Sequence, residues 1–292
     1  MDEGGLAVAA ATAASPSGAP LADEILAKAA HENFPVALGF LPPTVRRRLE
    51  AVYGFARLVD DAGDLYTGDR AALLDWIEAD LERAFAGCAE HPLLQRVSAV
   101  AAELSLPRDP FLRLLEANRV DQRIARYPTW ADLQAYCHLS ADPVGELVLY
   151  AFGAATPERI QWSDSVCTGL QLAEHWQDVG EDYERGRIYL PQEDMLRFGV
   201  TERDISEELP SETFRQLMAF EVARARDSLD GGLPLVASLS GRYRLAIAAY
   251  VGGGRAALDA VEYSGYDVLS RIPRAGGPSR MRATLRVLRE AA

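Results

Sequence analysis

The segment "LQLAEHWQDVGEDYERGRIYLP", residues 170–191, carries an apolar pattern and an acidic pattern, both at helical spacing. The apolar residues of a buried helix face are Leu170, Leu172, Ala173, Trp176 and Val179. The acidic stripe consists of Gln171, Glu174, Asp178, Glu181 and Asp182. Gly186 then ends the predicted helix, and Arg187 and Tyr189 follow at once. Because carboxylates are seldom buried without a partner, the stripe is either an ordinary solvated face or one wall of a metal site.

The rest of the sequence predicts an almost wholly helical fold. Ala, Leu, Arg and Glu dominate, whereas alternating β-branched runs and Asn-Gly or Asp-Gly turns are missing. Proline and glycine punctuation predicts about ten helices. The breaks are expected at Pro42-Pro43, Pro92, Pro107 to Pro110, Pro128, Pro143, Pro157, Pro191 and Gly231-Gly232.

Composition divides the chain of 292 residues into one long helical domain and two tails. Residues 1–20 are rich in Ala, Ser, Gly and Pro and are expected to be disordered, and Asp2 and Glu3 argue against a signal peptide. Residues 21–273 show no composition shift and are predicted to be a single domain. Residues 274–292 hold five arginines against Glu290, so they form a basic tail or helix. This segment either docks on the acidic body or lies on an anionic membrane surface.

Charge and cysteine usage exclude several classes of protein. A formal net charge of −13 and a pI near 4.8 oppose nucleic acid as a partner. Cys88, Cys137 and Cys167 are too far apart for a CxxC motif, and their odd number argues against a secreted disulfide framework. No apolar run reaches the length of a membrane span. We therefore predict a cytoplasmic protein and leave open peripheral contact with the inner face of the membrane.

A second acidic helix is predicted in "RRRLEAVYGFARLVDDAGD", residues 46–64. One stripe of this helix carries Tyr53, Arg57, Asp60, Asp61 and Asp64. Asp60 and Asp64 lie one turn apart, and like charges at that spacing destabilise a helix unless something neutralises them. Oxygen ligands select hard cations, and Mg²⁺ takes a few carboxylates together with phosphate oxygens. Two such helices face to face would hold a diphosphate through Mg²⁺, and Arg187 is suited to binding its oxygens.

Rival chemistries lack their motifs. His31, His91, His138 and His175 form neither HExxH nor the Glu-x-x-His pairs of di-iron bundles, and His175 is interpreted as structural. Serine and cysteine lack a nucleophile motif. The glycines of "GGGRAAL", residues 252–258, follow no strand and form no nucleotide-binding loop, so no NADPH site is predicted.

Four stretches of the chain resemble the squalene/phytoene synthase family of head-to-head prenyl synthases over residues 31 to 272. They are "ENFPVALGFLP" (32–42), "VYGFARLVDDAGD" (52–64), "RYPTWADLQAYCHLSADPVGELVL" (126–149) and "LQLAEHWQDVGEDYERGRIYLPQED" (170–194). The resemblance implies an all-α isoprenoid synthase bundle around a central apolar cavity. Residues that could line this cavity are Phe34, Phe55, Leu147, Val148 and Leu170.

The resemblance also implies roles for individual residues. It implies two or three bound Mg²⁺ ions. Asp60 and Asp64 would be the first set of ligands, Asp178 and Asp182 would be the second set, and Asp61 and Glu181 would support them. Residues that match positions at the diphosphate or in its pocket are Tyr53, Arg57, Arg187, Tyr189, Arg271 and, in place of the family's serine, Asn33. Tyr136 matches a tyrosine of the reaction cavity, and Gln171 matches an amide beside the metals.

Within the family, "ENFPV", "SADPVG" and "HWQDV" resemble the bacterial hopanoid-pathway branch of hydroxysqualene synthases. That branch is a carbon-oxygen lyase that converts presqualene diphosphate to hydroxysqualene, with loss of diphosphate and no reductant. Three residues depart from the wider family pattern. The family usually has Asn at the position of Glu174, Arg at the position of Gln177 and Tyr at the position of Gly254. The loss of an arginine suits a substrate with one diphosphate, whereas Glu174 could alternatively add a metal ligand.

Two other functions stay open at this point. A sibling prenyltransferase would join two prenyl diphosphates head to head into presqualene diphosphate, squalene or phytoene. A catalytically inactive helical protein would keep the lipid pocket as a carrier. The expected partner is a prenyl or presqualene diphosphate in each case, and association with pathway enzymes is left open.

Overall fold

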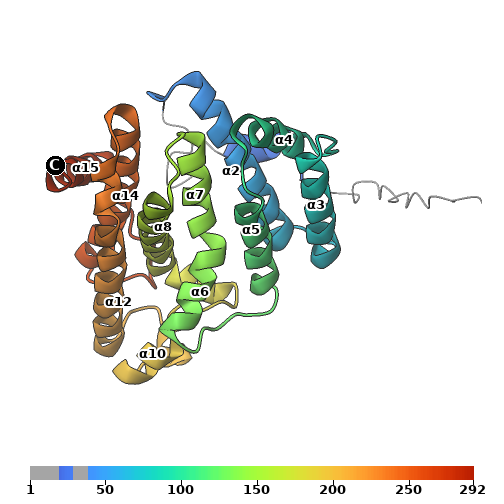
Figure 1. Ribbon diagram of the computed structural model, residues 1–292. Coiled ribbons are helices and arrows are strands. Elements are labelled where there is room, and N and C mark those ends of the chain that lie inside the picture. Colours follow the sequence, from blue (N-terminus) through green and yellow to red (C-terminus); the bar gives the residue numbers. More distant parts are fainter. Residues whose placement is uncertain (1–19, 29–38) are drawn as a thin grey trace, which may run out of the picture.

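The computed structural model describes residues 20–28 and 39–292. Their regular structure is helical, and the one β-type contact among them is an isolated bridge between Arg126 and Ile188 (Figure 1). The all-α prediction is confirmed. The helices are α1 Ala22–Lys28, α2 Pro43–Asp64, α3 Arg70–Phe85, α4 Pro92–Leu104, α5 Asp109–Asp121, α6 Trp130–Ser140, α7 Asp142–Ala151, α8 Pro157–Gln177, α9 Val179–Glu184, α10 Gln192–Phe198, α11 Glu202–Ile205, α12 Glu212–Gly231, α13 Leu233–Ser238, α14 Gly241–Tyr263 and α15 Gly277–Glu290.

Prolines set where several of these helices begin. Pro43, Pro92 and Pro157 are the first residues of α2, α4 and α8, where a fixed φ suits the helix and the missing N–H removes no helical bond. The described helices outnumber the ten predicted. The difference arises mainly because α9, α10, α11 and α13 are short helices in the segments that connect the long ones.

The acidic helix that the sequence predicts to end at Gly186 is interrupted at Asp178, between α8 and α9. The segment that follows α14, residues 264–276, packs against this junction. A Cβ added to Gly180 would lie 3.1 Å from the carbonyl oxygen of Val268, and the Gln177 side chain donates to the carbonyl of Pro273. The break places Asp178 at the end of one helix and Asp182 in the next.

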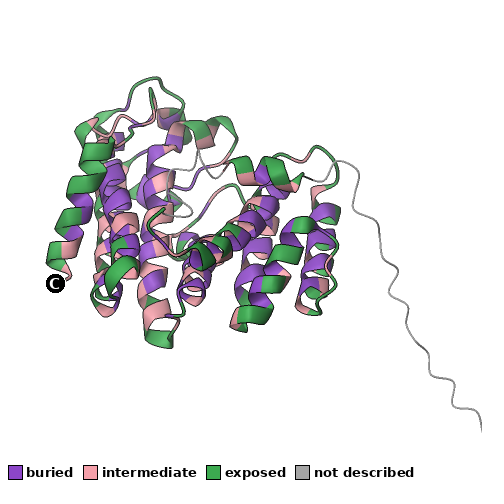
Figure 2. Cartoon of the chain, turned by 90° about the horizontal axis from the view of Figure 1, so that it is seen from above, coloured by how far each residue is buried: buried purple, intermediate pink, exposed green. Residues whose placement is uncertain are grey.

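Two apolar cores meet along α2. Toward one side, Phe55 packs edge-on against Phe111, with ring centroids 5.0 Å apart, in a core formed mainly by α2 to α5. Toward the other side, Val45 and Leu49 join the core of α6 to α8 and α12 to α14. Buried residues line the inner faces of these helices (Figure 2). α2 and α8, which carry the two acidic motifs, therefore belong to one packed bundle.

The C-terminal helix α15 packs on α14 at one edge of the bundle (Figure 1). Ala283, Thr284 and Val287 are its buried residues. The helix therefore docks on the body through one side, and this contact does not decide whether its other side meets a membrane. Residues 1–19 of the expected disordered tail, and also His31, Asn33 and Phe34, lie outside the described residues, and the domain boundaries stay predictions. Among the described helices, none is both long and apolar enough to cross a bilayer.

Candidate active site

A cavity of about 330 Å³ lies between α2, α7, α8, α13 and α14. Val148 and Leu170 line it as predicted, together with Val52, Val144 and Ile247. The other two expected lining residues that can be placed, Phe55 and Leu147, are instead fully buried core residues. The central apolar cavity is therefore present, and aliphatic side chains of α2, α7, α8, α13 and α14 form its wall.

Polar groups from both acidic helices reach this cavity. Tyr53, Arg57 and Asp60 come from α2, and Gln171 and Glu174 come from α8. The two groups of residues are more than a hundred positions apart in the sequence but line a single cavity. The cavity thus combines apolar walls with carboxylate, amide and guanidinium groups.

Asp60 and Asp61 are neighbours with different surroundings. Asp60 lines the cavity, and its desolvation there raises its pKa to about 6, although the amide of Asn118 donates to it at 3.2 Å. Asp61 is buried away from the cavity and pairs with Lys28 at 2.7 Å and with Arg57 at 3.0 Å. The structure therefore brings Asp60 to the cavity and gives Asp61 the task of fixing Arg57.

The second motif contains three acids at the junction of α8 and α9. Burial raises the pKa of Asp178 to about 6, and the nearby Asp182 and Glu181 add to the shift, whereas His175 and Arg274 oppose it. Asp182 lies 3.9 Å from His175. Glu181 is exposed and its carboxylate is 3.6 Å from Arg185, so it stands outside the group formed by the two aspartates.

Arg187 connects the two motifs. Its guanidinium donates to the Asp64 carboxylate at 2.9 Å. Arg271, predicted at the diphosphate, is exposed and lines a different hollow, between the end of α14 and α15. Arg274, which the sequence did not single out, is the arginine whose charge acts on Asp178.

Tyr136 and Tyr189 belong to a layer of rings beneath the acids. Tyr189 stacks on His175 with centroids 3.7 Å apart, and Tyr136 packs against Tyr189 at 5.7 Å. The Tyr136 hydroxyl donates to Asp121 at 2.7 Å, and burial raises the pKa of that aspartate. The charge of Arg187 acts on both Asp121 and Tyr189, and His175 lies beside Asp182, so the ring layer adjoins both acidic motifs.

Sequence reasoning missed Asn118 and Asp121, and it assigned His175 no place in the site. Asn118 and Asp121 lie one turn apart on α5, but this helix also carries several other polar and charged residues, so the pair gave no distinct signal in the sequence. His175 is one turn from Gln171, whose amide lies 3.1 Å from the His175 Nε2. That spacing could have placed the histidine on the acidic stripe.

The donor set of the two motifs fits Mg²⁺. Asp60, Asp64, Asp178 and Asp182 offer only oxygen ligands, and burial together with mutual repulsion makes the anions of Asp60 and Asp178 unfavourable without a cation. In the part of the chain that the structure describes, these acids do not gather three ligand atoms within 4.8 Å. Such separated walls leave room for phosphate oxygens between them.

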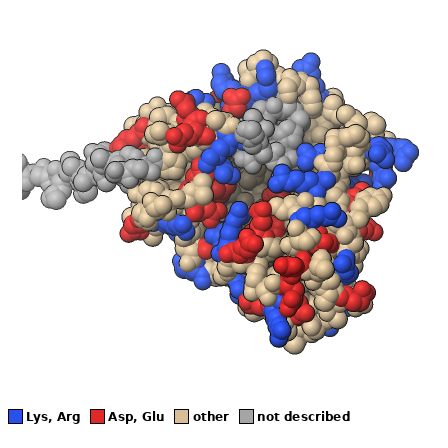
Figure 3. All heavy atoms as spheres, turned by 180° about the vertical axis from the view of Figure 1, so that it is seen from behind, with Lys and Arg blue, Asp and Glu red and all other residues tan. Residues whose placement is uncertain are grey.

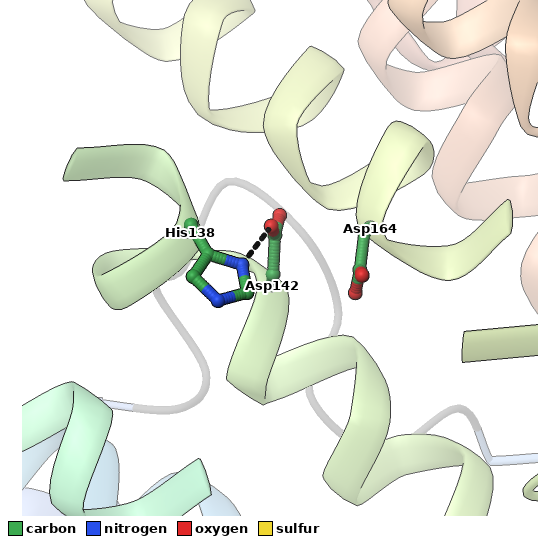
Figure 4. Close-up of side chains that lie close together, drawn as sticks. All are labelled: His138, Asp142 and Asp164. Carbon is green, nitrogen blue, oxygen red and sulfur yellow. Dashed lines mark hydrogen bonds and ion pairs between the residues drawn. The ribbon is translucent and has the colours of Figure 1, made fainter. Parts of the chain in front are cut away.

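One compact trio of potential metal ligands lies elsewhere. His138, Asp142 and Asp164, from α6, α7 and α8, place their ligand atoms within 4.8 Å of one another (Figure 4). Asp142 already accepts from Thr168 at 3.0 Å and lies 3.2 Å from His138. The trio belongs to neither acidic motif.

An α-helical bundle with an apolar cavity and two acidic walls offers places for an apolar chain and, through cations, for a polyanionic head group. The family model for squalene/phytoene synthase matches residues 27–284. The crystal structure of squalene synthase HpnC from Alicyclobacillus acidocaldarius is similar at 44% identity and a TM-score of 0.79, over 83% of this chain and 92% of that one. The hydroxysqualene synthase of Rhodopseudomonas palustris is 34% identical over 74% of each chain. The 15-cis-phytoene synthase of Synechococcus elongatus is 32% identical over 79% of this chain and 80% of its own.

The chain belongs to the squalene/phytoene synthase family. Members of this family act on prenyl diphosphates and use Mg²⁺ through acidic residues. Both properties agree with the oxygen donors and the apolar cavity described above.

Proposed function

We propose that the protein converts presqualene diphosphate into hydroxysqualene and diphosphate, with Mg²⁺ and without a reductant. The observation that carries this proposal is the environment of Gln177, where the wider family has an arginine. Gln177 is 8% exposed, and its side-chain amide donates to the carbonyl of Pro273. The position adds no positive charge to the site, which suits a substrate with one diphosphate rather than two.

The chain's own groups then have distinct tasks. Arg57, which Asp61 holds in place, and Arg187, which now pairs with Asp64, bind oxygens of the diphosphate and stabilise its growing charge. Asp60, Asp64, Asp178 and Asp182 would hold Mg²⁺. When bound, Mg²⁺ neutralises the leaving diphosphate and acts on it as a Lewis acid.

The cavity controls what happens to the carbocation. The C–O bond breaks with its electron pair on the diphosphate, and a cyclopropylcarbinyl cation remains. Aliphatic walls such as Val148 and Leu170 offer no nucleophile while this cation rearranges. One water then forms the new C–O bond and releases a proton to solvent, so that atoms and charge balance.

The test is to incubate the purified protein and Mg²⁺ with presqualene diphosphate and, separately, with farnesyl diphosphate, and to identify the products by mass. We expect hydroxysqualene from the first substrate and no product from the second. A thirty-carbon diphosphate or hydrocarbon made from farnesyl diphosphate alone would contradict the proposal and support a sibling prenyltransferase.

The inactive lipid-binding alternative needs its own variant. In Asp60→Asn with Asp178→Asn, we expect Mg²⁺-dependent binding of inorganic diphosphate to be lost, because one oxygen ligand is neutralised on each wall. Unchanged binding would contradict the role of the acidic motifs in holding Mg²⁺ and diphosphate. The neighbouring variant Glu181→Gln, at an exposed acid of the same motif, is the matched control.

A further inference from the structure

The C-terminal helix α15 concentrates positive charge on an acidic protein. Residues 274–292 carry five arginines and one acid, whereas the whole chain has a net charge of −13. The one acid, Glu290, is paired with Arg255 at 2.6 Å, and Arg255 also pairs with Asp230. The positive charge of α15 is thus not neutralised within the helix.

Packing fixes which side of α15 faces outward. Ala283, Thr284 and Val287 contact the body, and Gly252 of α14 lies so close that a Cβ there would come within 2.6 Å of the Thr284 backbone. The opposite side of the helix is exposed along its length (Figure 2). Met281 and Leu285, one turn apart, are 61% and 58% exposed there. This apolar pair lies on the outward side of α15 rather than in the packed cores of the described residues.

A basic pocket adjoins this apolar pair. A hollow of about 550 Å³ between the end of α14, residues 271–276 and α15 is lined by Arg271, Arg274, Arg282 and Arg286. Within the described ranges, none of these four arginines forms an ion pair, although Asp267 and Asp178 act at longer range on the first two. The acid in the lining, Asp259, is paired with Arg226 at 2.8 Å. Basic side chains gather at the edge where α15 lies (Figure 3).

We propose that α15 and this pocket dock the protein on an anionic phospholipid bilayer. The arginines of the pocket bind headgroup phosphates, and Met281 and Leu285 enter the boundary between headgroups and acyl chains. Tyr263, which lines the same hollow and is 91% exposed, lies where an amphipathic ring meets the interface. A protein with a net charge of −13 approaches such a surface only through a local basic face.

The proposal goes beyond the proposed function and does not depend on it. It would nevertheless serve that function, because presqualene diphosphate is amphiphilic and hydroxysqualene is almost wholly apolar. An enzyme docked on the membrane would take presqualene diphosphate from the bilayer and release hydroxysqualene into it.

Flotation of the full chain with liposomes tests the docking without catalysis. We expect the protein to float with vesicles of phosphatidylglycerol and phosphatidylcholine, to stay behind with phosphatidylcholine alone, and to be released by high salt. Arg282→Gln with Arg286→Gln, and separately Met281→Ser with Leu285→Ser, should each weaken the binding by about tenfold or more. Leu196→Ser with Arg203→Gln, which changes an exposed leucine and an exposed arginine elsewhere, should float like the wild type.

Several outcomes would overturn the docking. They are no flotation with anionic vesicles, equal flotation with neutral ones, or patch variants that float like the wild type. Binding of inorganic phosphate in solution without vesicle binding would show that the pocket takes a soluble anion instead. All variants should keep the wild-type melting temperature and turn over detergent-solubilised presqualene diphosphate as the wild type does, so failed docking and failed catalysis are distinguishable.

Discussion

The guanidinium of Arg187 donates to the carboxylate of Asp64 at 2.9 Å, across 123 positions of sequence. This contact joins the last aspartate of the first acidic motif to the arginine that follows the second. Without a diphosphate between the walls, the arginine and the carboxylate neutralise each other. We expect that bound Mg²⁺ would pair with Asp64 and a diphosphate with Arg187, so that substrate binding would separate the two side chains.

Replacing Arg187 tests the importance of this contact for catalysis. Arg187→Gln removes a charge that would act on the leaving diphosphate, and we expect turnover to fall roughly 100-fold. The control is Arg185→Gln, because Arg185 is exposed and only 3.6 Å from the outward-facing Glu181. Steady-state kinetics of both variants provide the measurement. Equal activity in the two variants would remove Arg187 from the diphosphate site.

The hydroxyl of Tyr136 is expected to stabilise the ring layer through Asp121. Tyr136→Phe removes the 2.7 Å hydrogen bond to this buried carboxylate and should lower the free energy of unfolding by about 1 to 3 kcal/mol. Tyr127→Phe is the matched control, since the buried Tyr127 hydroxyl has no hydrogen-bond partner among the described residues. Urea denaturation of the two variants measures the difference. The expectation is wrong if both substitutions change stability equally.

Close approach of α14 and α15 makes Gly252 sensitive to substitution. In Gly252→Ala, the new methyl group would lie 2.6 Å from backbone of Thr284, which cannot rotate away, so we expect a loss of about 1 to 3 kcal/mol. Gly231→Ala adds the same group on α12, where its nearest neighbour is an ordinary 3.7 Å away. Thermal denaturation measures the difference. If both variants had the melting temperature of the wild type, this account of α15 docking would be contradicted.

Glu221 should make the stability of the fold depend on pH. Burial raises its pKa to about 8, Asp194 adds to the shift, and Arg224 opposes it. Between the usual 4.5 and about 8, the folded protein keeps this proton while the unfolded chain releases it, so stability falls as pH rises through that window. The slope is at most about 1.4 kcal/mol per pH unit.

The variant Glu221→Gln keeps a neutral side chain at every pH and should show a flatter stability curve. We expect it to match the wild type near pH 4.5 and to exceed it near pH 8. Glu207→Gln, at an exposed position, should follow the wild-type curve. Parallel curves for the wild type and Glu221→Gln in guanidinium denaturation would show that the carboxyl is ionised in the folded protein.

The sequence was sufficient for the helical class and for finding two acidic stripes, because periodicity and like charge at helical spacing are local properties. It placed Asp60, Gln171 and Glu174 on stripes that do face one cavity. It could not separate Asp61 from Asp60, since the difference arises from Lys28, which lies 33 positions away in sequence. Asn118, Asp121 and Arg274 were missed for the same reason, because only the packed bundle brings them to the acids.

The central claim is that water captures a cation formed from presqualene diphosphate in this cavity. The most direct measurement is the mass of the product formed from presqualene diphosphate in water enriched in heavy oxygen, with farnesyl diphosphate as the parallel substrate. We predict hydroxysqualene that carries one heavy oxygen atom and diphosphate that carries none from the solvent. A hydrocarbon product, an alcohol with unlabelled oxygen, or product from farnesyl diphosphate alone would contradict the account.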